Sequence, residues 1–262
     1  MILHKVRSLA DILRRDPVEF TQRVAAIAEG RAERLLRRHV DYEPAPASGA
    51  ADLLVDVFGS NATAAFAEPA LAEIEAEVLD RLAMLAPRAP YTLAHNADLA
   101  LARCCYVACR CAQPEYVVET GVGYGVTSAF MLRALRENGR GVLHSVDLPP
   151  LERGAEDDAG ALVPEALRAV WTVHRGMSRR LLPGLLERLG AIGVFVHDSL
   201  HTYDNMRFEF AQAWPRLREG GILLSDDIQG NAAFSELRAL SPRAWGAFRQ
   251  TAKPALFGIA AR

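Results

Sequence analysis

Three glycines at alternate positions follow a short apolar segment near the middle of the chain, in the stretch E-Y-V-V-E-T-G-V-G-Y-G-V-T-S over 115–128. The apolar residues predict a buried strand, and the glycines predict a tight turn that leads into a helix. Because glycine has no Cβ and tolerates positive φ, Gly121, Gly123 and Gly125 would let a ligand of nucleoside size lie against the main chain. The segment therefore predicts a cofactor-binding loop in an α/β fold.

The spacing of these glycines indicates which cofactor the loop accepts. The dinucleotide fingerprint G-x-G-x-x-G would place its third glycine at position 126, where this chain has Val126. Glu119, two residues before the first glycine, would repel a diphosphate but would attract a cationic group. Both observations count against a nicotinamide dinucleotide as the ligand.

The pattern E-x-G-x-G-x-G over 119–125 resembles the first motif of the class I S-adenosylmethionine-dependent methyltransferases. The cofactor of that family carries an ammonium and a sulfonium and has no phosphate, which suits an acid beside the loop. The resemblance implies that Glu119, Gly121, Gly123 and Gly125 bind S-adenosylmethionine. It also implies a further series of strands and helices after the loop.

The rest of the chain supplies that series. Apolar segments predict further strands at 141–147, 170–174, 192–196, 222–225, 244–251 and 255–260. Asp147 ends the second strand about 20 residues past the glycines, where this architecture hydrogen-bonds ribose hydroxyls. In the family, the turn that contains Met177 and Ser178 lies against the adenine. We therefore expect a doubly wound, Rossmann-like α/β sheet of seven strands over 94–262, mostly parallel with an antiparallel last strand.

The first 93 residues have a different pattern. Apolar residues at helical spacing predict helices over 9–13, 18–39 and 70–85, and Pro, Ser and Gly predict a linker over 42–50. We expect a helical N-terminal cap over 1–93, which is also the expected surface for a homo-oligomer. The arginine-rich stretch at 31–38 is interpreted as a solvated helix face, because neighbouring glutamates balance its charge.

Composition excludes several partners. The chain has 262 residues, half of them hydrophobic, and a net charge of -2, so it has no basic bias towards nucleic acid. No apolar run approaches the roughly 18 residues of a membrane span, and the N-terminus lacks the features of a secretory signal. A cytoplasmic enzyme without nucleic-acid or membrane partners is the expectation.

Four cysteines lie close together, at 104, 105, 109 and 111. Their spacing lacks the paired C-x2-C of structural zinc sites. The segment 99–111 predicts a helix, and small apolar cysteines suit its buried face. Reduced, buried thiols are therefore favoured over a metal site.

A second signature follows the predicted fourth strand. D-S-L-H-T-Y over 198–203 resembles the D-G-D-H-x-Y signature of a methyltransferase family that includes sugar and natural-product O-methyltransferases, and 217–227 resembles the strand that follows it there. In relatives with a divalent metal, the corresponding ligands are Asp198, Asp226 and Asp227, which would suit Mg²⁺. Ser199 and Leu200 depart from the signature. A role of the acidic pair as a turn or cap after the strand is the alternative to metal binding.

His201 is the predicted catalytic base. Transfer of a methyl group to a hydroxyl requires removal of the hydroxyl proton, and neutral imidazole suits that role. Asp198, three residues earlier, would orient His201, contact the cofactor or bind the metal. His197 is a weaker candidate because it lies on the opposite side of the strand, and His144 and His174 are expected to be structural.

These features favour an S-adenosylmethionine-dependent methyltransferase that O-methylates a small hydroxylated molecule, such as a sugar or natural product. The alternative is a catalytically silent member of the fold that serves as a scaffold or binding protein. An NAD-linked oxidoreductase is a distant third. The predicted lid over 148–164 would select the acceptor, whose identity the sequence does not reveal.

Overall fold

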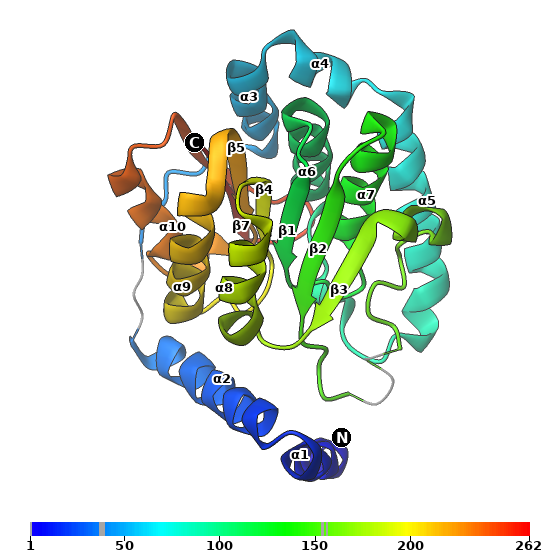
Figure 1. The fold of residues 1–262 in the computed structure, drawn as a ribbon, viewed down its shortest axis with the longest axis vertical. Coiled ribbons are helices and arrows are strands. Elements are labelled where there is room, and N and C mark those ends of the chain that lie inside the picture. The colour runs from blue at the N-terminus through cyan, green and yellow to red at the C-terminus, as the bar shows by residue number, and fades with distance from the viewer. Residues whose placement is uncertain (1, 37–39, 153–154, 156) are drawn as a thin grey trace.

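The computed structural model describes residues 2–36, 40–152, 155 and 157–262, and Figure 1 shows one twisted sheet with helices on both sides. The strands are β1 (Tyr116–Thr120), β2 (Val142–Asp147), β3 (Trp171–Arg175), β4 (Ile192–His197), β5 (Leu217–Ser225), β6 (Ala244–Arg249) and β7 (Leu256–Ala261). The α-helices are α1 (Ile2–Arg15), α2 (Pro17–Leu36), α3 (Ala47–Phe58), α4 (Ser60–Phe66), α5 (Pro69–Leu85), α6 (Leu99–Ala112), α7 (Val126–Asn138), α8 (Ser178–Leu189), α9 (Tyr203–Ala213) and α10 (Ala233–Glu236).

The strands form a single sheet in the order β3-β2-β1-β4-β5-β7-β6. Neighbours from β3 to β5 pair in parallel, and β7 lies antiparallel between β5 and β6. The strand order reverses between β1 and β4, and open α/β sheets bind ligands at such a point, beyond the carboxyl ends of the strands. The predicted doubly wound, Rossmann-like sheet with an antiparallel last strand is confirmed.

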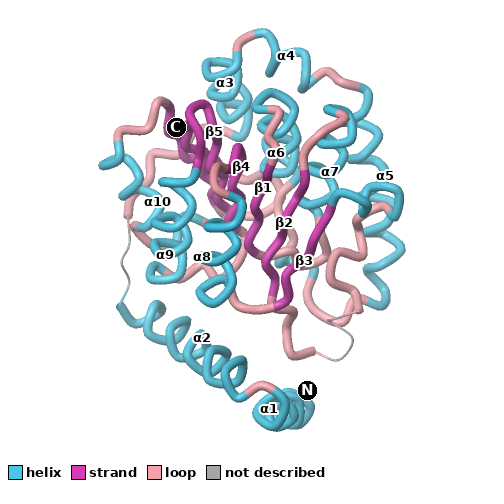
Figure 2. The backbone as a smooth tube through the Cα atoms, in the orientation of Figure 1, coloured by secondary structure: helices cyan, strands magenta, loops and turns pink. Residues whose placement is uncertain are grey.

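Helices cover both faces of the sheet, so each face has its own apolar core (Figure 2). Val117 of β1 belongs to the core that contains α6 and α7, whereas Val118 belongs to the core that contains α8 and α9. Side chains alternate along a strand, so a strand covered on both faces must be apolar on both. This explains the apolar run over 192–196 in β4, a strand in which all six residues are buried.

Helix α1 is longer than the expected helix over 9–13, α4 was not predicted, and α3 and β5 differ from the sequence prediction. The second half of the expected linker over 42–50 is the start of α3, whose residues Ala50, Leu54 and Val57 are buried at helical spacing. Pro46 stands just before this helix without a side-chain capping bond, and proline is compatible with the start of a helix as well as with a loop. Strand β5 begins at Leu217, five residues before the expected strand over 222–225. The end of the helix predicted over 18–39 lies outside the described residues.

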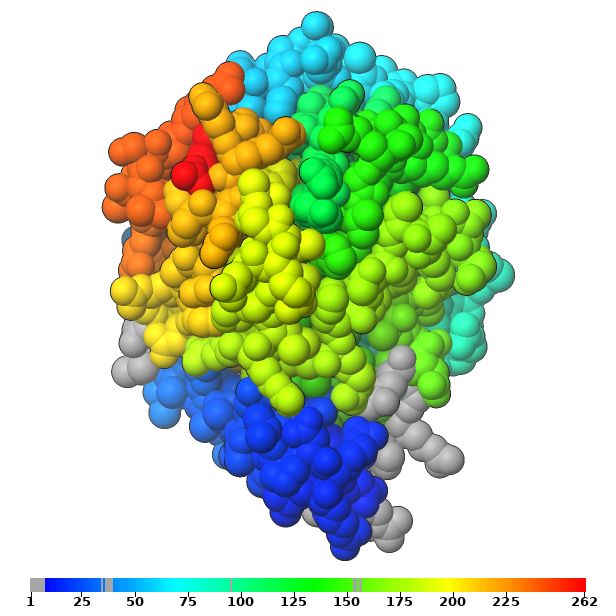
Figure 3. Space-filling view, viewed as in Figure 1, coloured from blue at the N-terminus to red at the C-terminus, as the bar shows by residue number. Residues whose placement is uncertain are grey.

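The helices before the sheet divide into two groups. Helices α3 and α5 contribute Leu54 and Ile74 to the core that contains α6 and α7. Helices α1 and α2 instead cross the end of the molecule at which β1 to β3 terminate, and in Figure 3 their blue atoms lie against the yellow-green segment that follows β3. The division of the chain at residue 93 stays a prediction. None of the helices within the described ranges is long and apolar enough to cross a membrane.

Polar contacts attach α2 to the sheet. Glu19 Oε1 accepts a hydrogen bond of 2.9 Å from Arg23 Nε, and Glu19 Oε2 pairs with Arg175 at 3.1 Å. Arg23 also donates to the carbonyl of Pro149 at 3.1 Å. Both Glu19 and Arg23 are buried. Two further ion pairs join Glu29 to Arg179 and Asp16 to Arg180.

We expect Glu19→Ala to loosen α2, because removal of one partner of a buried ion pair leaves the other charge uncompensated. The cost should be about 3 kcal/mol, at the low end of the usual range because Arg175 is 38% exposed. Limited trypsin digestion with mass spectrometry should then show cleavage at Arg31 faster by on the order of 100-fold.

Asp11→Ala is the matched control. It removes a pair with Arg14 whose side chains are 75% and 81% exposed, and such pairs contribute little. Equal cleavage rates for the two variants would contradict a structural role for the buried pair.

Candidate active site

A cleft of about 420 Å³ opens at the carboxyl ends of β1, β2 and β4. Eight of the residues predicted to bind a cofactor, a metal or an acceptor line it: Gly121, Gly123, Asp147, Met177, Ser178, Asp198, His201 and Asp227. Ala26 of α2 and Tyr91 also contribute to its wall, which the sequence did not predict. Glu119, Gly125 and Asp226 are the predicted residues that do not line the cleft.

The glycines of the loop after β1 serve different purposes. A Cβ on Gly121 would lie 1.9 Å from the carbonyl oxygen of Asp198, so only glycine permits this approach of the loop to the end of β4. A Cβ on Gly123 would meet only the Tyr91 hydroxyl, at 4.0 Å. The main chain at Gly123, with φ of +52°, is therefore the part of the loop that leaves room for a ligand. Gly125 packs instead against Gly160 and Val163.

Asp147 lies at the end of β2 with its carboxyl group in the wall of the cleft. Its Oδ1 atom accepts a hydrogen bond of 2.9 Å from the backbone N–H of Val122, which fixes the side chain against the glycine loop. Burial raises the pKa of this carboxyl, although the N–H groups of Val122 and Gly123 oppose the shift. The second oxygen makes Asp147 a suitable acceptor for ligand hydroxyls.

Glu119 lies behind the glycine loop and is completely buried. Its carboxylate accepts hydrogen bonds of 2.6 Å from Thr127 and 2.7 Å from each of Ser128 and Ser145. Burial raises its pKa to about 7, even though the three hydroxyl groups oppose the shift. The structure therefore gives Glu119 the role of joining β1 to β2 and α7, and its predicted contact with a cationic ligand stays a prediction.

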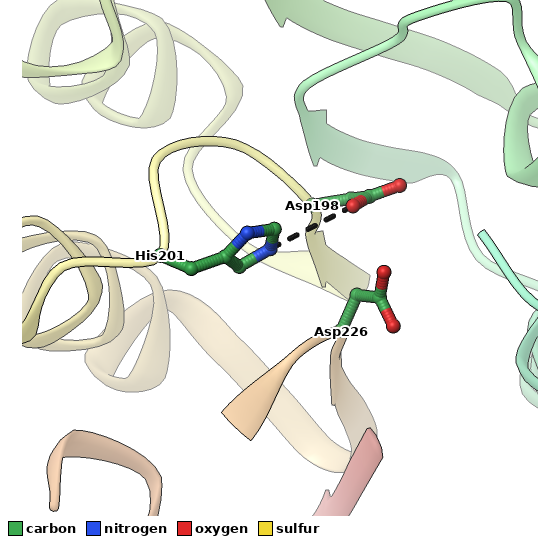
Figure 4. A group of neighbouring side chains, drawn as sticks. All are labelled: Asp198, His201 and Asp226. Atoms are coloured by element: carbon green, nitrogen blue, oxygen red, sulfur yellow. Dashed lines mark ion pairs between the residues drawn. The ribbon is translucent and has the colours of Figure 1, made fainter. Parts of the chain in front are cut away.

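Asp198, His201 and Asp226 point towards one another from the ends of β4 and β5 (Figure 4). One ligand atom from each lies within 4.8 Å of the others, which differs from the predicted metal set in that His201 takes the place of Asp227. His201 Nε2 lies 3.7 Å from Asp198 Oδ1, and His201 Nδ1 lies 3.9 Å from Asp227 Oδ2. No hydrogen-bond partner for Nε2 is present in the described part of the chain.

The surroundings of these groups shift their protonation. Burial lowers the pKa of His201 to about 3, and the neighbouring His197 acts in the same direction. Burial and the charge of Asp227 raise the pKa of Asp226 to about 6, and burial together with Asp226 raises that of Asp198 well above its usual value. His201 is therefore a neutral imidazole whose Nε2 can act as an acceptor, and the lowered pKa makes it a weaker base than a free imidazole.

Two residues of the loop between β6 and β7 complete the acidic cluster, and the sequence analysis did not identify them. Gln250 donates hydrogen bonds to Asp226 at 2.5 Å and to Asp227 at 3.3 Å. Lys253 Nζ lies 3.5 Å from a carboxylate oxygen of each of the same two aspartates. Strand β7 pairs with β5, and this pairing brings the loop to the end of β5.

A buried polar network supports the site from below, centred on Glu209 of α9. Its carboxylate accepts hydrogen bonds from Thr120 at 2.5 Å, from His197 Nδ1 at 2.6 Å, from Ser199 at 2.8 Å and from Asn205 at 3.0 Å. Burial alone would raise the pKa of Glu209, but the charge and hydrogen bond of His197 together with hydroxyl groups such as that of Thr120 outweigh burial, and the pKa falls to about 2.

His197 is thus bound to Glu209 inside the protein and does not line the cleft. The signal for Glu209 was available in the sequence. Asn205 and Glu209 interrupt an otherwise apolar helix face that contains Met206, Phe210 and Ala213. Polar residues on a buried helix face must find partners, and here the partners lie beneath the cleft.

Comparison with known proteins agrees with this geometry. Residues 118–228 match the family model of a methyltransferase domain. No curated protein sequence matches the chain. The matched segment runs from β1 to just beyond the acidic pair, so it contains the glycine loop, Asp147 and the cluster around His201.

Solved structures with the same fold include several O-methyltransferases. The O-methyltransferase TomG from Streptomyces achromogenes, involved in tomaymycin synthesis and solved with S-adenosylmethionine, is 18% identical over 74% of this chain and 89% of that one, with a TM-score of 0.55. An O-methyltransferase from Bacillus cereus, solved with S-adenosylhomocysteine, is 16% identical over 71% of this chain and 90% of that one, with a TM-score of 0.56. At these identities the structural similarity shows a shared fold. Together with the match to the methyltransferase family model, it confirms the predicted resemblance to the class I methyltransferases.

The raised pKa of Glu119 predicts a specific pH dependence of stability. Because the pKa of this acid is about 7 in the folded protein and about 4.5 when it is unperturbed, the unfolded chain releases the proton first as pH rises. The stabilisation that Glu119 gives the folded protein is therefore complete below pH 4.5. It is lost as pH rises towards 7, and the free energy of unfolding falls by roughly 3 kcal/mol in total. Glu119→Gln should remove this loss, as measured by urea unfolding at a series of pH values.

Glu165→Gln, at a side chain that is 93% exposed, is the control and should retain the wild-type pH dependence. If the difference between wild type and Glu119→Gln stays constant between pH 4.5 and 7, the assignment of the raised pKa to Glu119 is wrong.

Proposed function

We propose that this class I methyltransferase transfers a methyl group from S-adenosylmethionine to a hydroxyl oxygen of a small molecule. One observation carries the proposal: six of the eight predicted cofactor residues and the neutral base His201 line the same cleft. O-methyltransferases share the fold, and one of them takes part in tomaymycin synthesis, which favours a natural product as acceptor.

The wall of the cleft fits the cofactor. The open main chain at Gly123 offers a flat surface, and Asp147 offers a carboxylate oxygen for ribose hydroxyls. Met177 and Ser178 also line the cleft and would supply an apolar and a polar contact. When it is bound, S-adenosylmethionine supplies the methyl group as an electrophile on a sulfonium.

The residues at the ends of β4 and β5 fit the acceptor side of the reaction. The acceptor hydroxyl must lose its proton as the new O–C bond forms, and Nε2 of His201 is free to take it. The charge of Asp227, whose Oδ2 lies 3.9 Å from Nδ1, would stabilise the imidazolium that results. Asp227 lies near the other ring nitrogen and favours the tautomer with the proton on Nδ1.

A catalytically silent scaffold remains the second candidate, and it would also bind the cofactor. The place of His201 favours the enzyme: Nε2 of His197 also lacks a hydrogen-bond partner among the described residues, but His197 is fully buried, whereas His201 lines the cleft, where an acceptor could reach it. Mg²⁺ at Asp198, Asp226 and Asp227 is less well supported, because the ammonium of Lys253 already lies between two of these acids. Association through the N-terminal helices and a cytoplasmic location stay predictions.

The cofactor assignment predicts that S-adenosylhomocysteine binds and that Asp147→Ala weakens this binding. Loss of a charged acceptor of hydrogen bonds should cost about 1.5 to 3 kcal/mol, which is roughly a 10-fold to 150-fold increase in Kd. Isothermal calorimetry measures both, with Asp52→Ala on α3 as a control that removes an exposed acid of the same kind. Tight binding of NAD without a response to S-adenosylhomocysteine would end this proposal.

The assignment of His201 as the base predicts that His201→Ala lowers kcat by about 10² to 10⁴ while the affinity for S-adenosylhomocysteine stays nearly unchanged. Turnover is measured on an acceptor found by screening hydroxylated natural products and sugars. His174→Ala, on β3 away from the cleft, should keep wild-type turnover. Unchanged kcat in His201→Ala would show that another group removes the proton, and cofactor binding without turnover on any acceptor would favour the scaffold.

A further inference from the structure

Lys253 is a rare residue in this chain. The sequence contains 30 Lys and Arg residues, and lysine occurs only at positions 5 and 253. The Nζ atom of Lys253 lies 3.5 Å from Asp226 Oδ2 and 3.5 Å from Asp227 Oδ1. Its ammonium therefore bridges two of the three carboxylates that the family resemblance assigns to a metal.

Buried contacts fix the loop that presents this lysine. Both oxygens of Asp98, which caps the start of α6 and is buried, accept hydrogen bonds from the loop. The donors are the backbone N–H groups of Thr251 and Ala252, at 2.9 and 2.7 Å, and the Thr251 hydroxyl. The N–H of Ala255 then donates to the carbonyl of Lys253 at 2.8 Å and closes the turn. Lys253 is only 25% exposed, so it is held at the cluster by the fold.

A divalent cation would have to share this place with the ammonium. Mg²⁺ binds carboxylate oxygens at about 2.1 Å, so an ion on Asp226 Oδ2 could lie no farther than about 5.6 Å from a nitrogen that is 3.5 Å from the same oxygen. Like charges at that separation in a partly buried site repel each other, and the repulsion opposes metal binding. Gln250 occupies the other oxygen of Asp226 with a hydrogen bond.

We propose that Lys253 is the resident cation of the acidic cluster and takes the place of a divalent metal there. Its ammonium offsets the charges of Asp226 and Asp227 and holds their side chains beside His201. Lys253 is in this sense a positioning residue. The inference rests on the proposed function only in so far as the cluster borders the acceptor site.

The experiment compares Mg²⁺ and Mn²⁺ binding to the wild type, Lys253→Met and Lys5→Met, by calorimetry and by the electron paramagnetic resonance of free Mn²⁺. Lys5→Met removes the same charge from α1. We expect the wild type and Lys5→Met to show no binding of either ion up to millimolar concentration. Lys253→Met should bind both ions with a Kd at least tenfold below that concentration. Lys253→Arg keeps the charge and should behave like the wild type.

Equally tight metal binding by the wild type and Lys253→Met would overturn the proposal, and so would a failure of folded Lys253→Met to gain affinity. If that variant does not fold, the wild type is labelled at its lysines by reductive ¹³C-methylation and observed by NMR, with Lys5→Met assigning the signals. Selective broadening of the Lys253 signal by Mn²⁺ would then overturn the proposal, and an unaffected signal would support it. S-adenosylhomocysteine affinity is measured on the same samples. A protein that binds S-adenosylhomocysteine but contradicts the expected metal binding overturns the role of Lys253 and leaves the cofactor assignment of the proposed function intact.

Discussion

The site depends on backbone hydrogen bonds that continue the parallel sheet one residue past its strands. Gly121 N–H donates to the carbonyl of Val146 at 2.9 Å, Asp198 N–H to Thr120 at 2.8 Å, and Asp226 N–H to His197 at 2.9 Å. These bonds bring the first residues after β1, β4 and β5 to one edge of the sheet. Because a Cβ on Gly121 would collide with the Asp198 carbonyl, the cofactor loop and the acidic cluster can be neighbours only when that residue is glycine.

This arrangement concentrates acids in a partly buried place, and the protein stabilises each of them differently. Three hydroxyl groups surround Glu119, so that acid can stay in the interior with a raised pKa. Glu209 is paired with His197 and remains a carboxylate. Asp226 is bound by Gln250 and lies beside Lys253. Buried charges that are fully bonded hold their neighbours rigidly, which suits a site that must orient two reactants.

The sequence by itself determined the order of the elements and most of the residues that line the cleft. Periodicity and turn residues carry local information, so the glycine loop, Asp147 at the end of β2, and Asp198 and His201 after β4 could be placed from spacing alone. The carboxyl ends of parallel strands share one edge of a sheet, and a correct strand order therefore predicts that these residues meet. Helix α3 was missed in part because Pro, Ser and Gly suit both a linker and the start of a helix.

Only the tertiary structure decided what each of these residues faces and which distant residues join them. Glu119 stands in the motif that predicted a ligand contact, yet the packing of α7 turns its carboxylate towards three hydroxyl groups. Lys253 and Gln250 reach the acidic pair because β7 pairs antiparallel with β5, a contact between segments that are about 30 residues apart. No local pattern encodes such a pairing, since it depends on how the sheet closes around a shared core.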